Sequence, residues 1–345
     1  MTTTIRDVAK KLNISIYTVS RALDGYADVA DKTRELVIQT ANEMGYAPNR
    51  AARQLRRQKA ETIGFVVPAI AKRMSEPFST EFITGVGEQL SATNFDLLIS
   101  KAATEEAEQD LYHRWVNSHK VDGFILNRIR RHDWRVQNLT RWGIPFVGLG
   151  KSQDAVKYPC IRIEGARAYM ELVDHIQKIG FSRFAFVGGP ADLINHIERL
   201  RWFKAALKKN GLEVVQANVV STDMSSTGGY EAAQRLLRIP DPPDAIVCVN
   251  DETAFGVLHA LHETGLAVGT DVAVAGFEGV QDSRHTEPPL TTLDIPVTEI
   301  ARQLAQQLIE QINNPTLEIR EIVIEPQLVV RTSTGERSGD KEFQP

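Results

Sequence analysis

The first stretch of the chain carries two short amphipathic patterns in close succession. In residues 3–26, apolar positions recur every three to four residues and stop near Asn13, which predicts a first helix. A second pattern of the same kind begins after Ser15, a suitable N-cap, and ends at Gly25, which tolerates the positive φ of a helix end. Two short helices with a tight connection predict a helix-turn-helix, a unit whose second helix lies in the major groove of DNA.

The second helix of this pair is expected to turn three side chains toward DNA. Its apolar positions face the first helix, which leaves Ile16, Tyr17 and Arg21 on the outer side. Arginine can donate two hydrogen bonds to a guanine edge, and isoleucine or tyrosine can add apolar or hydroxyl contacts. We therefore predict these three residues as base contacts. The alternative is that Arg21 binds only phosphate or solvent and that Tyr17 packs locally.

A third helical pattern between residues 29 and 45 completes a small head. The next segment, residues 48–60, combines a thin apolar stripe with several arginines, and a helix of this kind is marginal alone because nucleation is costly. On DNA, its Leu55 would enter a minor-groove base step. The alternative is a disordered basic linker. The expected contacts to the DNA backbone are Thr4, Ser15, Thr18, Arg50 and Arg53.

The rest of the chain alternates short apolar runs with helical patterns, which predicts α/β lobes with parallel sheets. Two successive series imply two lobes with a cleft between them, and ligands bind such sheets beyond the carboxyl ends of the strands. The charged tail from Ser333 is predicted to be flexible. The predicted strands are residues 63–68, 95–100, 122–126 and 146–149, then 184–187, 214–220, 245–249 and 272–276, and finally 319–324 and 328–331, which follow a helix at 297–313.

Polar residues just past predicted strands are candidates for holding a ligand. Arg128, Asn250 and Glu278 each follow an apolar run, and Arg199 begins a helical pattern after a loop. Such groups can bind vicinal hydroxyls while apolar surfaces cover the carbons, so they suit a neutral polyhydroxy ligand. Each also has a structural alternative. Asn250 can bond the turn backbone, Arg128 can be solvated within its basic run, and Glu278 can pair with Arg284.

Composition narrows the class of protein. The 345 residues are 42% hydrophobic, enough for a large core and two or three domains. Residues 1–60 hold 11 basic and 6 acidic side chains, whereas the remainder holds 29 and 38, so a basic head precedes an acidic body. A basic head suits a polyanion such as nucleic acid. The two cysteines, Cys160 and Cys248, indicate neither a disulfide framework nor a metal site.

Targeting and catalytic motifs are missing or incomplete. The N-terminus lacks a signal-type apolar region and no apolar run is long enough for a bilayer, so we expect a cytoplasmic protein without membrane contact. The GLGKS run at 148–152 has Pro145 where a phosphate loop needs glycine, and His262 has no second histidine at Leu266. No G-x-S-x-G elbow occurs. We therefore expect no enzyme, no catalytic residue, no cofactor and no metal.

Several motifs in one order resemble the LacI/GalR family of bacterial transcriptional repressors. They are T-I-R-D-V-A, I-Y-T-V-S-R-A-L, G-Y-A-P-N, A-R-Q-L and T-I-G-F-V-V-P, and the resemblance continues to about Thr332. It implies a homodimer that binds a pseudo-palindromic operator in double-stranded DNA and a periplasmic-binding-protein-like body that binds a small molecule. By this resemblance Ile16, Tyr17 and Arg21 fall on base-contacting positions, and Leu55 falls on the intercalating leucine of a hinge helix.

The resemblance also implies a domain plan. It consists of a helix-turn-helix domain at 1–47, a hinge at 48–60, a two-lobe effector-binding and dimerisation domain at 61–332 and a tail at 333–345. The chain is expected to cross between the lobes near Glu164, Thr291 and Glu325.

The resemblance identifies effector positions as well. Arg199 matches the effector-binding arginine and Asn250 the N-D pair, although Arg201 and Trp202 stand where small residues are usual. Met224 stands where an aromatic residue often stacks. The full expected set is Phe78, Ser79, Arg128, Arg199, Met224, Asn250 and Glu278, the last in place of a common aspartate. Sugars are the most frequent effectors of the family. Purines or nucleosides are one alternative, and a sugar-binding protein or a DNA binder without an effector are others.

Overall fold

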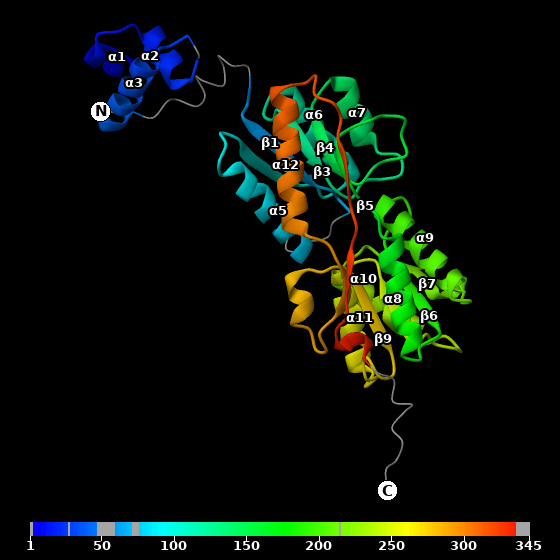
Figure 1. Ribbon diagram of the computed structural model, residues 1–345. Helices are drawn as coiled ribbons and strands as arrows, with labels where there is room; N and C mark the ends of the chain where they lie inside the picture. Colours follow the sequence, from blue (N-terminus) through cyan, green and yellow to red (C-terminus); the bar gives the residue numbers. More distant parts are fainter. Residues whose placement is uncertain (1–2, 27, 47–58, 71–75, 214, 336–345) are drawn as a thin grey trace. The chain divides into compact units, whose positions relative to one another are not determined.

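The structure is a computed structural model in which the chain divides into two units, residues 1–60 and 61–345. In the described part of the first unit, the helices are α1 (Ile5–Leu12), α2 (Ile16–Leu23) and α3 (Asp31–Glu43), as Figure 1 shows. Their apolar faces meet in one small core. The described residues are 3–26, 28–46, 59–70, 76–213 and 215–335. The predicted contacts Arg50, Arg53 and Leu55 therefore lie outside the described residues.

The helix-turn-helix predicted from the apolar spacing is confirmed. Thr4 and Asp7 form a capping box at the start of α1, and Asn13 ends this helix with a left-handed φ of 54°. Ser15 caps α2, because its hydroxyl accepts a hydrogen bond from the Thr18 amide at 2.9 Å. These caps satisfy amide groups that have no partner inside the helix, and the short turn between Asn13 and Ser15 follows from them.

The first lobe of the second unit is a six-stranded sheet in the order β11-β5-β4-β3-β1-β2, and every pair in it is parallel. Figure 1 shows that α12 lies in this lobe although it comes late in the chain. The strands are β1 (Thr62–Val67), β2 (Asp96–Lys101), β3 (Gly123–Leu126), β4 (Phe146–Leu149), β5 (Cys160–Ile163) and β11 (Glu321–Ile324), and the helices are α5 (Pro77–Leu90), α6 (Glu105–Asn117), α7 (Trp134–Trp142) and α12 (Val297–Asn313).

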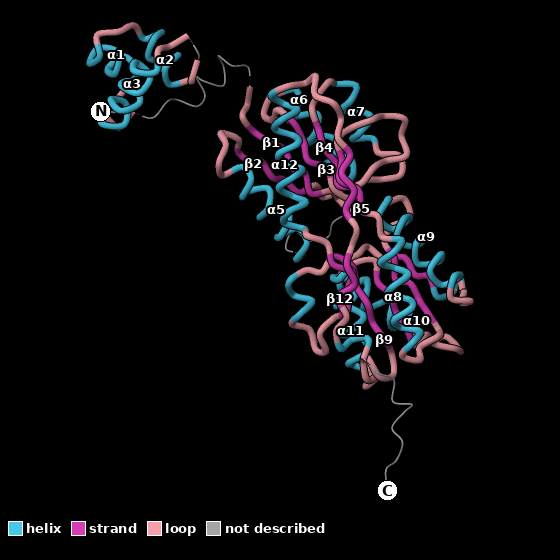
Figure 2. The backbone as a smooth tube through the Cα atoms, viewed as in Figure 1, coloured by secondary structure: helices cyan, strands magenta, loops and turns pink. Residues whose placement is uncertain are grey.

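The second lobe holds another six-stranded sheet in the order β12-β10-β9-β8-β6-β7 (Figure 2). All its pairs are parallel except β12 with β10, which is antiparallel and departs from the predicted all-parallel sheets. The strands are β6 (Phe184–Gly188), β7 (Val219–Ser221), β8 (Ala245–Cys248), β9 (Ala273–Glu278), β10 (Thr291–Asp294) and β12 (Gln327–Val329), and the helices are α8 (Ala166–Lys178), α9 (Ile194–Lys209), α10 (Ser226–Leu236) and α11 (Asp251–Glu263).

The chain passes between the lobes three times, as expected. Two passages lie where the sequence placed them, between β5 and α8 near Glu164 and between β11 and β12 at Glu325. The third is displaced. Thr291 is the first residue of β10 and belongs to the second sheet, so the chain crosses after this strand, next to Pro296. The predicted position near Thr291 is therefore wrong by the length of one strand.

Two boundaries differ from the sequence prediction. The strand predicted over 214–220 is only Val219–Ser221, because Asn218 turns inward and donates a hydrogen bond to the Phe184 carbonyl at 3.2 Å. The sequence prediction places the start of the flexible tail, Ser333, too early in the chain. Ser333 and Thr334 are fully buried in a 3-10 turn, and the Ser333 hydroxyl donates to the Val274 carbonyl at 2.6 Å. The packed body therefore extends beyond Thr332, its predicted last residue.

No helix within the described ranges is both long enough and apolar enough to cross a bilayer.

Candidate functional site

A pocket lies where the carboxyl ends of strands from both sheets meet. It comprises about 870 Å³ of space not filled by protein atoms, including its open mouth. Six of the seven predicted effector residues line it, namely Phe78, Arg128, Arg199, Met224, Asn250 and Glu278. The structure thus brings together side chains that are up to 200 positions apart in the sequence.

Ser79 is the exception among the predicted residues. It is buried within α5 and does not line the pocket. Successive residues of a helix point about 100° apart, so Phe78 can face the cavity while the next side chain turns into the lobe. The sequence motif identified the right turn of helix but could not separate these neighbours.

Arg199 and Glu278 form a buried charged pair in the second lobe. The Nη1 of Arg199 lies 3.7 Å from the Glu278 Oε1, and both side chains are 7% exposed. The same guanidinium donates to the Val249 carbonyl and lies 3.7 Å from the centre of the Phe277 ring. Glu278 therefore pairs with Arg199 rather than with Arg284, the alternative partner considered from the sequence.

Arg128 and Glu76 form the matching pair in the first lobe. Their side chains are about nine-tenths buried and bonded directly to each other, so Arg128 does not simply extend into solvent. Each arginine of the pocket thus has a carboxylate of its own. The sequence did not suggest Glu76, because no strand end or motif marks it.

Burial sets the charge state of two carboxyls in the second lobe, Glu278 in the pocket lining and Asp251 next to Asn250. It raises the pKa of Glu278 to about 8, although Arg199 opposes the shift. Burial also raises the pKa of Asp251 to about 7, against the effect of a 2.6 Å hydrogen bond from Thr292 and a bond from the Val280 amide. Near neutral pH these two carboxyls are therefore close to the point where they take up a proton.

Three pocket residues have strained backbones. Arg128, Met224 and Glu278 have φ values of 48°, 65° and 111°, in a region that side-chain-bearing residues seldom adopt. Conformations of this kind cost on the order of 1 to 3 kcal/mol each and gather at functional sites. Each of the three residues lies at or just after the end of a strand. The strain turns their side chains into the cavity.

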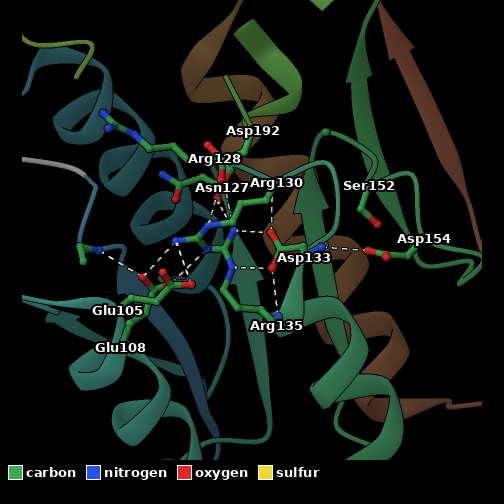
Figure 3. A network of polar contacts seen from close by, with 12 residues as sticks. Glu105, Glu108, Asn127, Arg128, Arg130, Asp133, Arg135, Ser152, Asp154 and Asp192 are labelled. Carbon is green, nitrogen blue, oxygen red and sulfur yellow. Dashed lines mark hydrogen bonds and ion pairs between the residues drawn. The ribbon is translucent and has the colours of Figure 1, made fainter. Parts of the chain in front are cut away.

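A buried network fixes the backbone that presents Arg128 (Figure 3). The fully buried Arg135 donates from Nη2 to the carbonyls of Asn127 and Arg128, both at 3.1 Å, and lies 2.7 Å from an Asp133 oxygen. Glu108 lies 3.6 Å from the other side of the guanidinium. Removing one member of such a buried pair costs about 3 to 5 kcal/mol. No pattern in the sequence indicated this network, because Arg135 follows a basic run that resembled a solvated surface.

Asn250 contributes a side chain that is already bonded. Its oxygen accepts from the Thr253 amide at 3.1 Å and caps α11, and its Nδ2 donates to the Met224 carbonyl at 3.2 Å. The structural alternative from the sequence therefore applies, although Asn250 also lines the cavity. The bond from Asn250 Nδ2 positions Met224, whose sulfur lies 3.8 Å from the side-chain Nδ2 of Asn195.

Other pocket residues were not predicted. They include Glu198 and Glu252, and also Asn195 and Trp202, which share a face of α9 with Arg199 because they lie four positions before it and three after it. The helical spacing was therefore the signal that could have found them. Trp202 occupies a position where the resembling family usually has a small residue, and it brings an indole ring to the wall.

The side chains of α2 that were predicted to face DNA gather on one side of the helix. Ile16 and Tyr17 are 44% and 68% exposed, as expected of side chains that do not serve the core. Arg21 lies one turn further along and donates from Nη1 to the Tyr17 hydroxyl at 3.0 Å. It also pairs with Asp28 at 2.7 Å, a partner that the sequence did not suggest.

Among the described residues, those expected to contact the DNA backbone, Thr4, Ser15 and Thr18, lie at helix N-termini. Thr4 and Ser15 are caps, and the Thr18 and Ser15 hydroxyls are 2.8 Å apart. Helix N-termini attract phosphate because their amides point outward. Both cysteines are free and buried, and the part of the chain that the structure describes holds no group of three or more His, Cys, Asp or Glu that could bind a metal.

The sequence matches two family models. Residues 4–49 match that of bacterial regulatory proteins of the lacI family, and residues 173–334 match a periplasmic binding protein-like domain. The HTH-type transcriptional regulator AglR of Rhizobium meliloti is 32% identical over 97% of this chain and 95% of its own length. The HTH-type transcriptional regulator CelR of Thermobifida fusca is 31% identical over 96% and 98%.

Solved structures give the same result. A complex of the transcriptional regulator CelR with cellobiose has a TM-score of 0.73 at 29% identity and covers 96% of this chain and 99% of that chain. A lac repressor dimer bound to operator has a TM-score of 0.79 at 23% identity over 97% and 100%, a likeness of fold.

A helix-turn-helix head joined to a two-lobe body with a periplasmic-binding-protein-like fold defines a DNA-binding regulator of transcription. The chain belongs to the lacI family of bacterial regulatory proteins. The relatives that it matches over nearly their whole length are transcriptional regulators and not enzymes.

Proposed function

We propose that this regulator is a homodimeric repressor whose operator affinity is controlled by a neutral sugar bound between the two lobes. The observation that carries the proposal is the pocket, which gathers the strained residues Arg128, Met224 and Glu278 and two arginine–carboxyl pairs. Such pairs offer hydrogen-bond donors and acceptors side by side, which suits the hydroxyl groups of a sugar. The complex of the related CelR with cellobiose supports a sugar.

Apolar surfaces of the pocket support the same ligand class. Phe78 and Trp202 lie in the lining with Ile129 and Ile295, so aromatic and aliphatic faces can cover the carbons of a sugar ring. Closure of the lobes on the ligand would change operator affinity through the first lobe. Such couplings are typically about 1 to 3 kcal/mol and reciprocal, so DNA must change sugar affinity by the same factor. The protein would act without catalysis, in the cytoplasm where its DNA lies.

On the DNA side, we propose that Ile16, Tyr17 and Arg21 contact bases. Backbone contacts would come from Thr4, Ser15 and Thr18 in the head and from Arg50 and Arg53, with Leu55 entering the minor groove. The exposure of Ile16 and Tyr17 supports the first set. The assignments of Arg50, Arg53 and Leu55 rest on the resemblance of the sequence alone.

The effector is tested by thermal unfolding of the purified protein with mono- and disaccharides, including cellobiose, and with nucleosides and purines. We expect a sugar to raise the melting temperature and to change the affinity for operator DNA, because a ligand that binds only the folded state stabilises it. A nucleoside that acts alone would replace the sugar assignment. If no compound acts while DNA does, the pocket assignment fails.

Arg199→Lys and Arg201→Ala form a matched pair for the pocket. Both positions lie on α9, but only Arg199 lines the cavity. Arg199→Lys should weaken the sugar response at least about ten-fold, because lysine cannot reproduce the planar fork. Arg201→Ala should leave the response unchanged. Equal responses in the two variants would remove Arg199 from the site.

A further inference from the structure

The guanidinium of Arg21 is held on three sides within the described part of the head. A single Asp28 oxygen accepts from Nε at 3.1 Å and lies 2.7 Å from Nη2. The Tyr17 hydroxyl accepts from Nη1 at 3.0 Å. The Tyr26 ring covers one face, with its centre 4.1 Å from the guanidinium carbon. An arginine on an exposed helix face normally samples many rotamers, and here all three contacts limit that freedom.

Asp28 occupies one edge of the Arg21 guanidinium and so determines which edge remains available to a base. A guanidinium has five N–H groups, and Asp28 uses the side formed by Nε and Nη2. Tyr17 takes one hydrogen of Nη1, so Nη1 and Nη2 each keep one hydrogen, a pair that remains for a base. Guanine recognition in the major groove uses such a pair, directed to O6 and N7. The Tyr26 ring fixes the plane in which this pair lies.

We propose that Asp28 is a positioning residue for base recognition, which holds Arg21 in the orientation that discriminates guanine. The inference rests on the proposed role of Arg21 as a base contact. Asp28 touches Arg21 and acts on DNA only through it.

The acidic side chain of Asp28 lowers the electrostatic affinity of the head for the DNA backbone. Asp28 has a side chain that is 60% exposed, on the same side of the head as an arginine proposed to enter the groove. Its charge repels phosphate, since Lys and Arg contacts dominate affinity for the DNA backbone. An exposed ion pair also adds little to folding stability. Orientation of Arg21 is therefore the contribution that remains, and it predicts opposite effects on discrimination and on general affinity.

The test uses the full-length protein and duplexes that the wild type selects from a randomised oligonucleotide library. Kd values are measured for the parent duplex, for each single guanine-to-adenine change and for a scrambled duplex. Arg21→Ala identifies the base pair that Arg21 contacts, as the position where discrimination is lost. At that base pair Asp28→Asn should reduce discrimination about ten-fold. Other base pairs should change less than about two-fold, and binding to the scrambled duplex should stay equal or tighten.

Asp31→Asn is the matched control. It removes the same charge from the same head, but Asp31 pairs with Arg34 at 2.9 Å and not with Arg21. We expect it to leave discrimination unchanged at every base pair. Tyr26→Leu removes the stacked ring and should produce a partial loss at the same base pair as Asp28→Asn.

Each contrary result has a distinct meaning. If Asp28→Asn keeps or sharpens guanine discrimination, Asp28 does not orient Arg21 and the inference is overturned. A loss that is uniform over all base pairs and equal to that of Asp31→Asn would also overturn it, since it would reflect net charge. If Arg21→Ala leaves discrimination intact everywhere, the proposed base contact of Arg21 fails, and the inference fails with it.

Discussion

The buried pair of Arg199 and Glu278 gives the sharpest prediction for the body. Arg199→Met keeps most of the aliphatic length of the side chain and removes the charge. The substitution deletes the contact of 3.7 Å to Glu278 and the bond to the Val249 carbonyl. It also removes the cation that lies 3.7 Å above the Phe277 ring. A buried carboxyl is left without its counter-ion.

The magnitude follows from this burial. Where Glu278 is ionised, above its pKa of about 8, removing its partner from a buried ion pair costs about 3 to 5 kcal/mol, because the remaining charge is poorly solvated. Both side chains are 7% exposed, so water screens the pair little. In a protein of this size the loss corresponds to a fall in melting temperature on the order of 10 °C.

The effect should depend on pH in a defined direction. Burial raises the pKa of Glu278 to about 8 from an ordinary 4.5. Between these pH values the folded protein holds more protons than the unfolded chain, so this carboxyl makes the free energy of unfolding fall as pH rises. Without Arg199 its pKa rises further. The variant should therefore lose more stability relative to wild type at pH 8.5 than at pH 5.5, where Glu278 is protonated in both proteins.

The assay is thermal unfolding of wild type, Arg199→Met and Arg201→Ala at both pH values. Arg201 lies two positions along the same helix and is exposed, so its loss should change the melting temperature little. The reasoning is refuted if Arg199→Met melts like Arg201→Ala. It is also refuted if the destabilisation is larger at pH 5.5 than at pH 8.5.

Four further substitutions test other parts of the structure. Ser15→Ala removes the cap of α2 and should cost the head about 1 kcal/mol, seen as faster amide exchange in α2; unchanged exchange would contradict the cap. In Gly256→Ala the new Cβ would clash with the Ser226 backbone oxygen of α10, so we expect the free energy of unfolding, measured in urea, to fall by about 1 to 3 kcal/mol. In Gly87→Ala the new Cβ meets no atom within 4 Å, so the free energy of unfolding should rise by about 0.5 to 1 kcal/mol. A loss of stability in both variants would contradict this account. Thr292→Val deletes the 2.6 Å bond to Asp251 and should lower the urea midpoint by the equivalent of about 1 to 3 kcal/mol, and a midpoint equal to wild type would show that the bond contributes nothing.

Much of the fold could be predicted from the sequence because local pattern and local structure coincide in it. The apolar spacing on either side of Ser15 is enough to define two helices, since a cap and a glycine mark their ends. Helix α12 begins and ends where its periodicity predicts. Short edge elements were less predictable. The strand over 214–220 shrinks because Asn218 bonds to a carbonyl from a distant part of the chain.

The candidate site was likewise predictable from the sequence only in part. Glu278 could be proposed from its position at the end of a strand and Arg199 from the resemblance to the family, although α9 begins five residues before Arg199 and not at it, but the two could not be proposed as a pair, since 79 positions separate them. Glu76 and Arg135 carried no signal, because a buried charge and a solvated one look alike in sequence. Asp28 was likewise invisible as a partner of Arg21, although both lie in the head.

By itself, the sequence determined the helix-turn-helix, the α/β rhythm of two lobes and the family, because each depends on residue types at short spacing. Only the tertiary structure decided which side chains face one another: Arg199 with Glu278, Arg128 with Glu76, and Asp28 with Arg21. The physical reason is that burial and pairing are properties of the assembled chain. A charge acquires a shifted pKa, a fixed rotamer or a strained backbone only when residues from distant elements surround it.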